Sequence, residues 1–216
     1  MQIAIINYEM GNLFSVQNAC KLVRLNPVLT SDEKVIMDSD GIILPGVGAF
    51  AKAMDQLDKL KLIQPIQKSI KQGKPFLGIC LGMQLLFNES EEFGNSAGLG
   101  IIDGRVLKFP SDSNGIKIKV PQIGWNKIYK NKFHLNGSAA IMKGIDDGEY
   151  MYFVHSYYSK PTHDEDILTT TNYEGINYCS SIKRDNIIAT QFHPEKSSKK
   201  GISFYKNWAE LIKKRP

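Results

Sequence analysis

A cysteine between two glycines is the residue of this sequence best suited to nucleophilic chemistry. The segment Gly78-Ile79-Cys80-Leu81-Gly82 stands where a predicted apolar strand, residues 74–79, gives way to a predicted helix, residues 81–87. A sharp strand-to-helix turn brings backbone segments close together, and glycine relieves that crowding. Such a nucleophile elbow exposes a thiol at the carboxyl edge of a sheet, and the N-terminus of the following helix favours the thiolate. We therefore predict that Cys80 is a nucleophile.

A thiol nucleophile needs a base, and the base needs a group that orients it. His193 lies in Gln191-Phe192-His193-Pro194-Glu195, directly after an apolar strand predicted over residues 187–190. Residues two apart in extended chain point to the same side, so Glu195 can fix the tautomer of His193 and stabilise its imidazolium. His134 and His163 lie in polar, turn-like stretches without such a partner. The predicted catalytic set is Cys80, His193 and Glu195.

An acyl-transfer site also needs donors that point at the developing oxyanion. One is the backbone N–H of Leu81, directly after the nucleophile. A second could come from Pro45-Gly46-Val47-Gly48, which follows the strand predicted over residues 40–44 and would line the same sheet edge. A P-G-x-G stretch alone is often only a tight turn. It is not a P-loop here, because no Gly-Lys-Ser/Thr follows.

The elements that must position these groups alternate between strand and helix in the first half of the chain. Helical spacing begins at Asn12 or Ser15, continues over residues 49–73 with a break near Pro65, and returns over residues 81–87. Apolar strands are predicted over residues 2–7, 40–44 and 74–79. Strands separated by helices of this length imply parallel pairing with right-handed crossovers.

The second half of the chain is rich in short β segments separated by turns. Strands are predicted over residues 104–109, 116–120, 126–129, 149–154, 167–171, 177–182 and 187–191. A last helix is predicted over residues 199–214. The expected fold is one α/β domain over residues 1–216, with a mostly parallel, flavodoxin-like central sheet flanked by helices and an added antiparallel β layer.

Composition limits the classes of function. The 216 residues are 42% hydrophobic and 23% charged, as in an ordinary globular protein. The apolar runs are too short to span a bilayer, and the first residues do not resemble a signal peptide, so we expect a cytoplasmic location and no membrane association. Cys20 and Cys179 are interpreted as structural, and no cysteine spacing indicates a disulfide framework. We find no cluster of carboxylates or Cys/His with ligand spacing and no G-x-G-x-x-G segment, so we expect neither a metal nor an organic cofactor. A net charge of +5 is weak support for nucleic-acid binding.

Three segments together resemble the signatures of class I (triad) glutamine amidotransferases. They are Pro45-Gly46-Val47-Gly48, Gly78-Ile79-Cys80-Leu81-Gly82-Met83-Gln84 and Gln191-Phe192-His193-Pro194-Glu195-Lys196-Ser197. Within that family, three more segments resemble the glutaminase subunits of imidazole glycerol phosphate synthases. They are Asn7-Tyr8-Glu9-Met10-Gly11-Asn12-Leu13, Ile123-Gly124-Trp125-Asn126 and Tyr152-Phe153-Val154-His155-Ser156-Tyr157-Tyr158. The similarity covers nearly the whole chain.

The resemblance implies a glutaminase in which Cys80 attacks the side-chain amide of glutamine and forms a γ-glutamyl thioester. The implied oxyanion hole is made by Val47, Gly48 and Leu81. The implied glutamine-binding residues are Gly46, Gly48, Gln84, Glu92, Ser156 and Tyr157. In the family, the Pro-Gly-Val-Gly segment needs a peptide rearrangement before the oxyanion hole forms, which implies a glutaminase that is nearly silent until its partner binds substrate.

The implied partner is the cyclase subunit, a (β/α)8 barrel of histidine biosynthesis that receives ammonia within a heterodimer. Asn12, Gln122, Trp125 and Lys196 match positions that face it. Gln122 replaces the histidine usual in the family, and residues 110–116 look like an insertion. Both leave open a second acceptor, a sugar amidotransferase of surface-polysaccharide synthesis.

Two other classes of protein are weighed against these. The intact catalytic residues argue against a binding module that has lost activity. Gln84 and the segment over residues 152–158 favour glutamine over the substrate of a cysteine peptidase.

Overall fold

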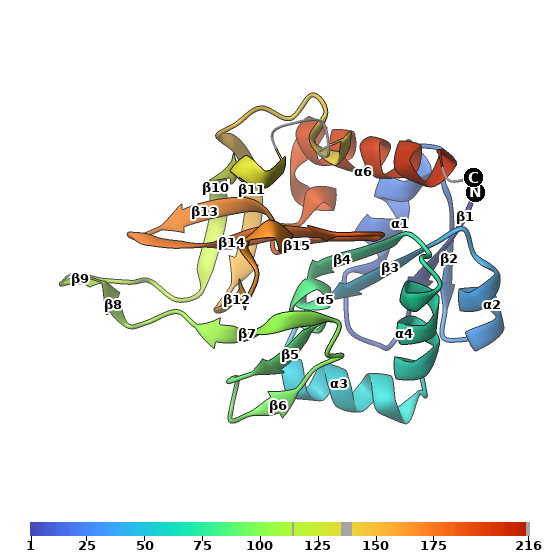
Figure 1. Ribbon diagram of the computed structural model, residues 1–216, viewed down its shortest axis with the longest axis horizontal. Helices are drawn as coiled ribbons and strands as arrows, with labels where there is room; N and C mark the ends of the chain where they lie inside the picture. Colours follow the sequence, from blue (N-terminus) through green and yellow to red (C-terminus); the bar gives the residue numbers. More distant parts are fainter. Residues whose placement is uncertain (114, 135–139, 215–216) are drawn as a thin grey trace.

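The computed structural model describes residues 1–113, 115–134 and 140–214. Its first half alternates between strands and helices, as the sequence predicts (Figure 1). The elements are β1 Gln2–Ile6, α1 Leu13–Leu22, β2 Asn26–Thr30, α2 Glu33–Asp38, β3 Gly41–Gly46, α3 Phe50–Lys59, α4 Ile63–Lys71, β4 Phe76–Cys80 and α5 Leu81–Gln84.

The centre of the molecule is a parallel sheet. Its strand order is β2-β1-β3-β4-β15, where β15 spans Ile187–Thr190, and each neighbouring pair is parallel. This is the order of a flavodoxin-like, doubly wound sheet. The predicted fold class is therefore confirmed, and the carboxyl ends of β3, β4 and β15 meet at one edge.

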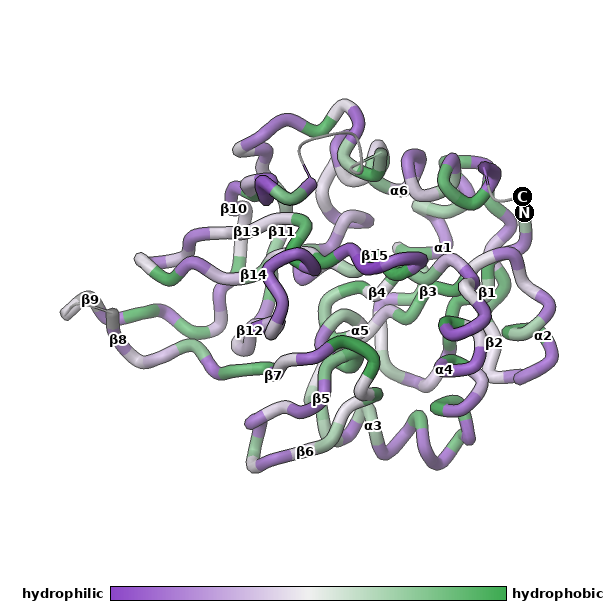
Figure 2. The backbone as a smooth tube through the Cα atoms, viewed as in Figure 1, coloured by the Kyte–Doolittle hydropathy of each residue, from purple (hydrophilic) through white to green (hydrophobic). Residues whose placement is uncertain are grey.

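Alternate residues of the strands face two separate hydrophobic clusters. Ile3 and Ile5 of β1 pack with α1 and with α6, the helix Ser198–Lys213. Ala4 and Ile6 of the same strand pack with α2, α3, α4 and α5 on the other face. Figure 1 shows α1 and α6 above the sheet and α3, α4 and α5 below it. In Figure 2, the colouring along β1 and β3 is mainly hydrophobic, as expected for strands covered on both faces.

The second half continues the same sheet with mostly antiparallel strands and adds a separate two-stranded sheet. The elements are β5 Phe87–Ser90, β6 Ser96–Ala97, β7 Ile102–Lys108, β8 Asp112–Ser113, β9 Ile116–Lys117, β10 Gln122–Lys130, β11 Glu149–His155, β12 Tyr157–Pro161, β13 Ile167–Tyr173 and β14 Ile176–Arg184. Short 3-10 helices span Lys132–His134, Ala140–Met142, Asp164–Asp166 and Pro194–Lys196. β14 pairs with β15 and so joins the antiparallel strands to the parallel core, while β10 and β11 branch from β13.

Several boundaries differ from the sequence prediction. The helix predicted over residues 81–87 ends at Gln84, because Phe87 begins β5. The break in the predicted helix 49–73 lies before Pro65, between the end of α3 at Lys59 and the start of α4 at Ile63. Pro65 stands in the first turn of α4, where a missing N–H costs no hydrogen bond. Asn12, not Ser15, caps α1, since its side chain accepts from the Ser15 backbone N–H at 3.3 Å.

The strands β2 and β12, the hairpin strands β5 and β6, and the helix α2 are absent from the sequence prediction. β2 begins with Asn26 and Pro27, which are unusual in a strand, but proline is tolerated in an edge strand such as this one. Asp32 caps α2 by accepting from the backbone of Lys34 at 2.7 Å. In the insertion-like segment 110–116, β8 and β9 form a short hairpin, and residue 114 lies outside the described residues. In the part of the chain that is described, no helix combines the length and apolar character that crossing a bilayer requires.

Candidate active site

The predicted nucleophile lies at a tight bend between β4 and α5. Cys80 has φ 55° and ψ −110°, a strained conformation for a residue with a side chain. The neighbouring glycines permit it: a Cβ on Gly82 would lie 1.8 Å from the Leu44 carbonyl oxygen, and one on Gly78 would lie 2.9 Å from the Gly82 carbonyl oxygen. α5 has only four residues, so any helix-terminus effect on the thiol comes from its first N–H groups rather than from a long helix dipole.

The predicted base and its orienting group are paired. The Nδ1 atom of His193 lies 2.7 Å from Oε1 of Glu195, and the two side chains are 3% and 1% exposed. β15 runs beside β4 in parallel, with Thr190 opposite Ile79, so the loop that carries His193 leaves the sheet next to Cys80. The Nε2 atom of His193 is buried and makes no hydrogen bond within the described part of the chain, which leaves it available for a proton from the thiol.

The electrostatics favour a charged imidazole. Burial alone would lower the pKa of His193, but the neighbouring Cys80 and Glu195 raise it to about 10. An imidazolium next to a sulfur stabilises the thiolate, which is the nucleophilic form. His193 is therefore favoured as an imidazolium beside the sulfur, with Glu195 holding the ring in orientation.

A pocket of about 250 Å³ opens beside the sulfur. It brings together eight of the residues predicted for catalysis, oxyanion binding or substrate binding: Val47, Gly48, Cys80, Leu81, Gln84, Glu92, Ser156 and Tyr157. Gly46 lies beside Cys80 in the β3–β4 register, while His193 and Glu195 are not part of the pocket wall. The volume is near the lower end for ligand sites and suits a molecule of amino-acid size.

Gln84 and Glu92 give the pocket two hydrogen-bond acceptors. The side-chain nitrogen of Gln84 donates to the Tyr157 carbonyl and to Oε1 of Gln191, both at 2.9 Å. Both amide hydrogens are thus used, and only the carbonyl oxygen of Gln84 can meet a ligand. One carboxylate oxygen of Glu92 accepts a hydrogen bond from the Phe50 backbone N–H at 2.6 Å, at the start of α3, and the second oxygen can accept from a ligand. These acceptors suit the ammonium group of a ligand.

The segment predicted to complete an oxyanion hole lies at the end of β3. Val47 is 43% exposed, and Gly48 has φ 103°. Tyr8, whose part in the site the sequence analysis did not predict, donates from its hydroxyl to the Pro45 carbonyl at 2.8 Å and holds the end of the strand. Burial, with the nearby Cys80, raises the pKa of Tyr8, so its hydroxyl stays protonated as a donor.

Other pocket residues were also missed. Pro121, Val154 and His155 line the pocket, and the sulfur of Cys80 lies 3.9 Å from the Val154 carbonyl oxygen. His155 donates from Nδ1 to the Tyr157 carbonyl at 2.8 Å, and burial lowers its pKa to about 4. The predicted strand 149–154 stopped one residue short of His155. Continuing its alternation would have placed that side chain with buried Phe153.

Three of the residues predicted to face a partner lie in accessible positions, and one does not. Trp125 is 49% exposed and packs edge-on against Tyr152 with ring centroids 6.0 Å apart. The ammonium of Lys196 lies 5.9 Å from the centroid of the same ring. Asn12, partly exposed, caps α1.

The prediction for Gln122 is wrong as regards its side chain. Gln122 is 0% exposed and accepts a hydrogen bond from the Tyr178 hydroxyl at 3.0 Å. Alternation along β10 turns it inward and turns Ile123, which is 62% exposed, outward. The replacement of the family's usual histidine is thus accommodated inside the fold.

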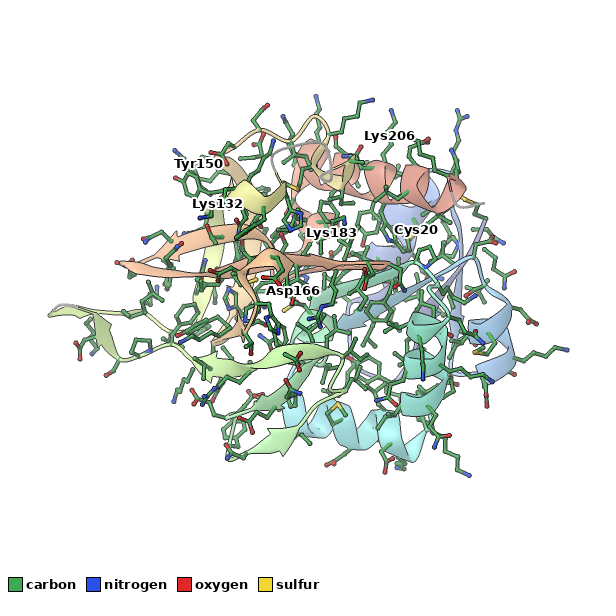
Figure 3. The ribbon with its side chains drawn as sticks, in the orientation of Figure 1. Cys20, Lys132, Tyr150, Asp166, Lys183 and Lys206 are labelled. Atoms are coloured by element: carbon green, nitrogen blue, oxygen red, sulfur yellow. The ribbon has the colours of Figure 1, made fainter. Side chains whose placement is uncertain are left out.

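The remaining cysteines are buried, as their structural interpretation requires. Cys20 lies in the interior on α1 (Figure 3), and burial, with the nearby Glu195, raises its pKa to about 12. Cys179 is 3% exposed, and burial raises its pKa. Within residues 1–113, 115–134 and 140–214, no three His, Cys, Asp or Glu side chains gather so as to hold a metal ion.

Comparisons with known proteins agree with this geometry. The family model described as glutamine amidotransferase class-I matches residues 10–210. The chain is 47% identical to the imidazole glycerol phosphate synthase subunit HisH of Syntrophotalea carbinolica, over 97% of this chain and 100% of that protein. It is 44% identical to the subunit of the same name from Aquifex aeolicus, over 99% of each chain.

Solved structures share the fold at low sequence identity. PurLQS from Thermotoga maritima matches with a TM-score of 0.74 and 17% identity, over 98% of each chain. The glutaminase domain of CTPS from Trypanosoma brucei, with bound acivicin, matches with a TM-score of 0.71 and 19% identity, over 100% of this chain and 95% of that one.

Proposed function

Because this chain belongs to the glutamine amidotransferase class-I family, we propose that it is the glutaminase subunit of an imidazole glycerol phosphate synthase. It hydrolyses L-glutamine to glutamate and ammonia, and the ammonia passes to a cyclase subunit in histidine biosynthesis. The observation that carries the proposal is that Cys80, beside a pocket of about 250 Å³, interacts with His193 of the His193–Glu195 pair. The names of relatives 44–47% identical over nearly the full chain support the acceptor.

The reaction follows from the positions of these groups. The thiolate of Cys80 attacks the side-chain amide carbon, and its C=O oxygen becomes an oxyanion that the N–H groups of Leu81 and of the Val47–Gly48 segment would stabilise. The imidazolium of His193 gives its proton to the amide nitrogen. The C–N bond then breaks, ammonia leaves, and the acyl group remains on Cys80 as the thioester. Neutral His193 then takes a proton from water, whose oxygen attacks the thioester carbon and releases glutamate and Cys80.

The pocket supports glutamine as the substrate. Glu92 and the carbonyl of Gln84 are acceptors for the α-ammonium group. Ser156, Tyr157 and the backbone at Gly46 and Gly48 complete the proposed binding set. The pKa of Tyr157 is raised, mainly by burial and then by Glu92 and Glu91, so its hydroxyl remains a donor.

The proposed partner surface includes Asn12, Trp125 and Lys196. A sugar amidotransferase as the alternative acceptor gains no support from the names of the relatives described above. The burial of Gln122 also weakens one reason for that alternative, because the changed side chain lies inside the fold and not on the surface that a partner would contact.

The test is reconstitution with the cyclase subunit of histidine biosynthesis. The complex should release glutamate and form imidazole glycerol phosphate from glutamine, whereas Cys80→Ala should lose this activity and keep the rate with free ammonia. Cys179→Ala, which removes a buried cysteine away from the pocket, should keep both. Absence of glutamate release with the cyclase, or an equal loss of the ammonia-dependent rate in Cys80→Ala, would contradict the proposal.

A further inference from the structure

A short series of buried hydrogen bonds connects the wall of the pocket to the sulfur of Cys80. The Gln84 side chain donates to the Tyr157 carbonyl and to Oε1 of Gln191, both at 2.9 Å. The nitrogen of the Gln191 side chain lies 3.6 Å from the sulfur of Cys80 and donates to it. Gln191 is 0% exposed. The mechanism described above gives this residue no role.

The direction of every bond in the series is fixed by one backbone carbonyl. The Tyr157 oxygen can only accept, so Gln84 must present its NH₂ group there. That group can only donate, so its second hydrogen must meet the oxygen of Gln191 and not the nitrogen. The NH₂ group of Gln191 is therefore the end that faces Cys80. The sulfur is held by a donor that cannot take its proton.

We propose that Gln191 is a positioning residue of the glutaminase reaction, which donates a hydrogen bond to the Cys80 sulfur and favours its thiolate form. This inference rests on the proposed function, since it assigns a role within that reaction. A hydrogen bond to the charged form of an acid favours ionisation. A thiolate cannot donate to the Val154 carbonyl, which lies 3.9 Å away, so Gln191 supplies a donor to the sulfur in addition to the His193 imidazolium.

The position of Gln191 argues against a purely structural role. Its backbone N–H already donates to the Ser180 carbonyl at 2.9 Å, so the side chain is not needed to extend the strand. An apolar side chain could fill a buried site without the cost of desolvating an amide. The amide is instead placed between a pocket residue and the nucleophile.

Other ionisable groups near the sulfur must be held constant in a test. His193 and Glu195 lie on the loop after β15, and Tyr8 follows β1. His155 ends β11, and both it and Glu92 line the pocket. Substitution at Gln191 leaves all of them in place. In Gln191→Met, which adds no charge, a change in thiol ionisation can then be assigned to the lost donor.

The experiment measures alkylation of Cys80 by iodoacetamide as a function of pH, with the site identified by peptide mass spectrometry. Gln191→Met keeps length and removes the donor, and we expect the midpoint of the profile to rise by about one pH unit. Gln191→Glu keeps the acceptor for Gln84 and places an oxygen toward the sulfur, so its midpoint should rise further. With the cyclase, kcat for glutamine should fall about tenfold in Gln191→Glu while KM stays within about twofold, because this variant keeps the acceptor that holds Gln84 and Gln191 itself does not line the pocket.

A control variant tests whether loss of a side-chain amide away from the pocket has the same effect. Gln67→Met removes a hydrogen bond from the Gln67 side chain to the Leu99 carbonyl, 2.9 Å long, at a position on α4 outside the pocket wall. It should leave the alkylation profile unchanged. If Gln191→Met does not fold, Gln191→Leu takes its place, because it also removes the donor without adding a charge, whereas a shift in Gln191→Glu alone would also follow from the added negative charge.

The outcomes distinguish this inference from the proposed function. Unchanged alkylation profiles in both Gln191 variants overturn the inference, even when the wild-type complex hydrolyses glutamine. If Gln191→Met is unstable, a Gln191→Glu profile that matches the wild type also overturns the inference. A shifted profile in a chain that releases no glutamate with the cyclase would support the role of Gln191 toward the sulfur and sink the proposed function instead.

Discussion

At the scale of single residues, the site depends on a few side chains whose surroundings change their ordinary chemistry. Cys80 adopts a strained backbone conformation at the end of its strand. His193 is buried, yet Cys80 and Glu195 raise its pKa to about 10. The pKa of His155, which is buried in the pocket wall, is shifted in the opposite direction, because desolvation dominates there. Two imidazoles in one site are thus held in different charge states.

We expect Glu195→Ala to reduce glutaminase activity less than His193→Ala, because Glu195 orients the imidazole and does not itself transfer the proton. The difference should be roughly tenfold to a hundredfold in glutamate release by the complex with the cyclase. His163→Ala, which removes a side chain 44% exposed, serves as the control and should keep full activity. Equal losses in the first two variants would contradict these roles.

His155 should make the stability of the protein depend on pH. Its pKa is lowered from 6.5 to about 4 in the fold, so the unfolded chain binds more protons between these values. The contribution is therefore present above pH 6.5 and lost as the pH falls toward 4. Over that range the wild type should lose on the order of 3 kcal/mol more than His155→Gln. Urea unfolding at several pH values measures this, and parallel curves for the two proteins would refute it.

At the scale of elements, three neighbouring parallel strands position the proposed catalytic groups at one edge of the sheet. β3 ends in the proposed oxyanion segment, β4 ends in the nucleophile, and β15 leads to the base. The carboxyl ends of parallel strands meet at one edge, which is where open α/β sheets bind their ligands. The bend after β4 fits only because Gly82 lets α5 approach β3 closely.

Gly82→Ala should disturb this bend strongly. Its Cβ would lie 1.8 Å from the Leu44 carbonyl oxygen, so the backbone must move, and we expect a loss of about 3 kcal/mol or more in the free energy of unfolding. At Gly41, a Cβ would meet only side-chain ends at 3.2–3.3 Å, so Gly41→Ala should cost less. Urea unfolding compares the two, and equal costs would show that β3 and α5 are not rigidly apposed.

At the scale of the whole molecule, the pocket and the predicted partner residues belong to neighbouring parts of the fold. β10 pairs with β11, which brings Trp125 beside Tyr152, and β11 continues to His155 in the pocket wall. A partner that contacts Trp125 and Lys196 would therefore contact a strand that also lines the active site. This connection offers a physical route by which partner binding could affect the glutaminase, through movement of β11.

Trp125→Ala should weaken binding of the cyclase by about tenfold or more, since an exposed tryptophan at an interface often dominates its energy. Leu22→Ala is the control: Leu22 is 70% exposed but ends α1, at the opposite edge of the sheet from the pocket. Isothermal titration of each variant with the cyclase provides the affinities. A Trp125 variant that binds as well as the wild type would remove this residue from the partner surface.

Much of the fold and part of the candidate site could be predicted because their signals are local. The glycines around Cys80 predict a tight bend, and the spacing of His193 and Glu195 predicts their pairing; the structure contains both features. Hydrophobic periodicity likewise predicts the parallel core. By contrast, β2 was missed because it is an edge strand that begins with Asn and Pro and lacks a continuous apolar run.

The sequence by itself therefore determined the nucleophile elbow, the His-Glu pair and the alternation of strands and helices, since each depends on residues close together in the chain. Only the tertiary structure decided that β15 lies beside β4, which brings Gln191 within 3.6 Å of a sulfur 111 residues away. It also decided that Gln122 faces inward and that His155 lines the pocket. Strand pairing and register between distant segments depend on how the whole core packs, and no local pattern encodes them.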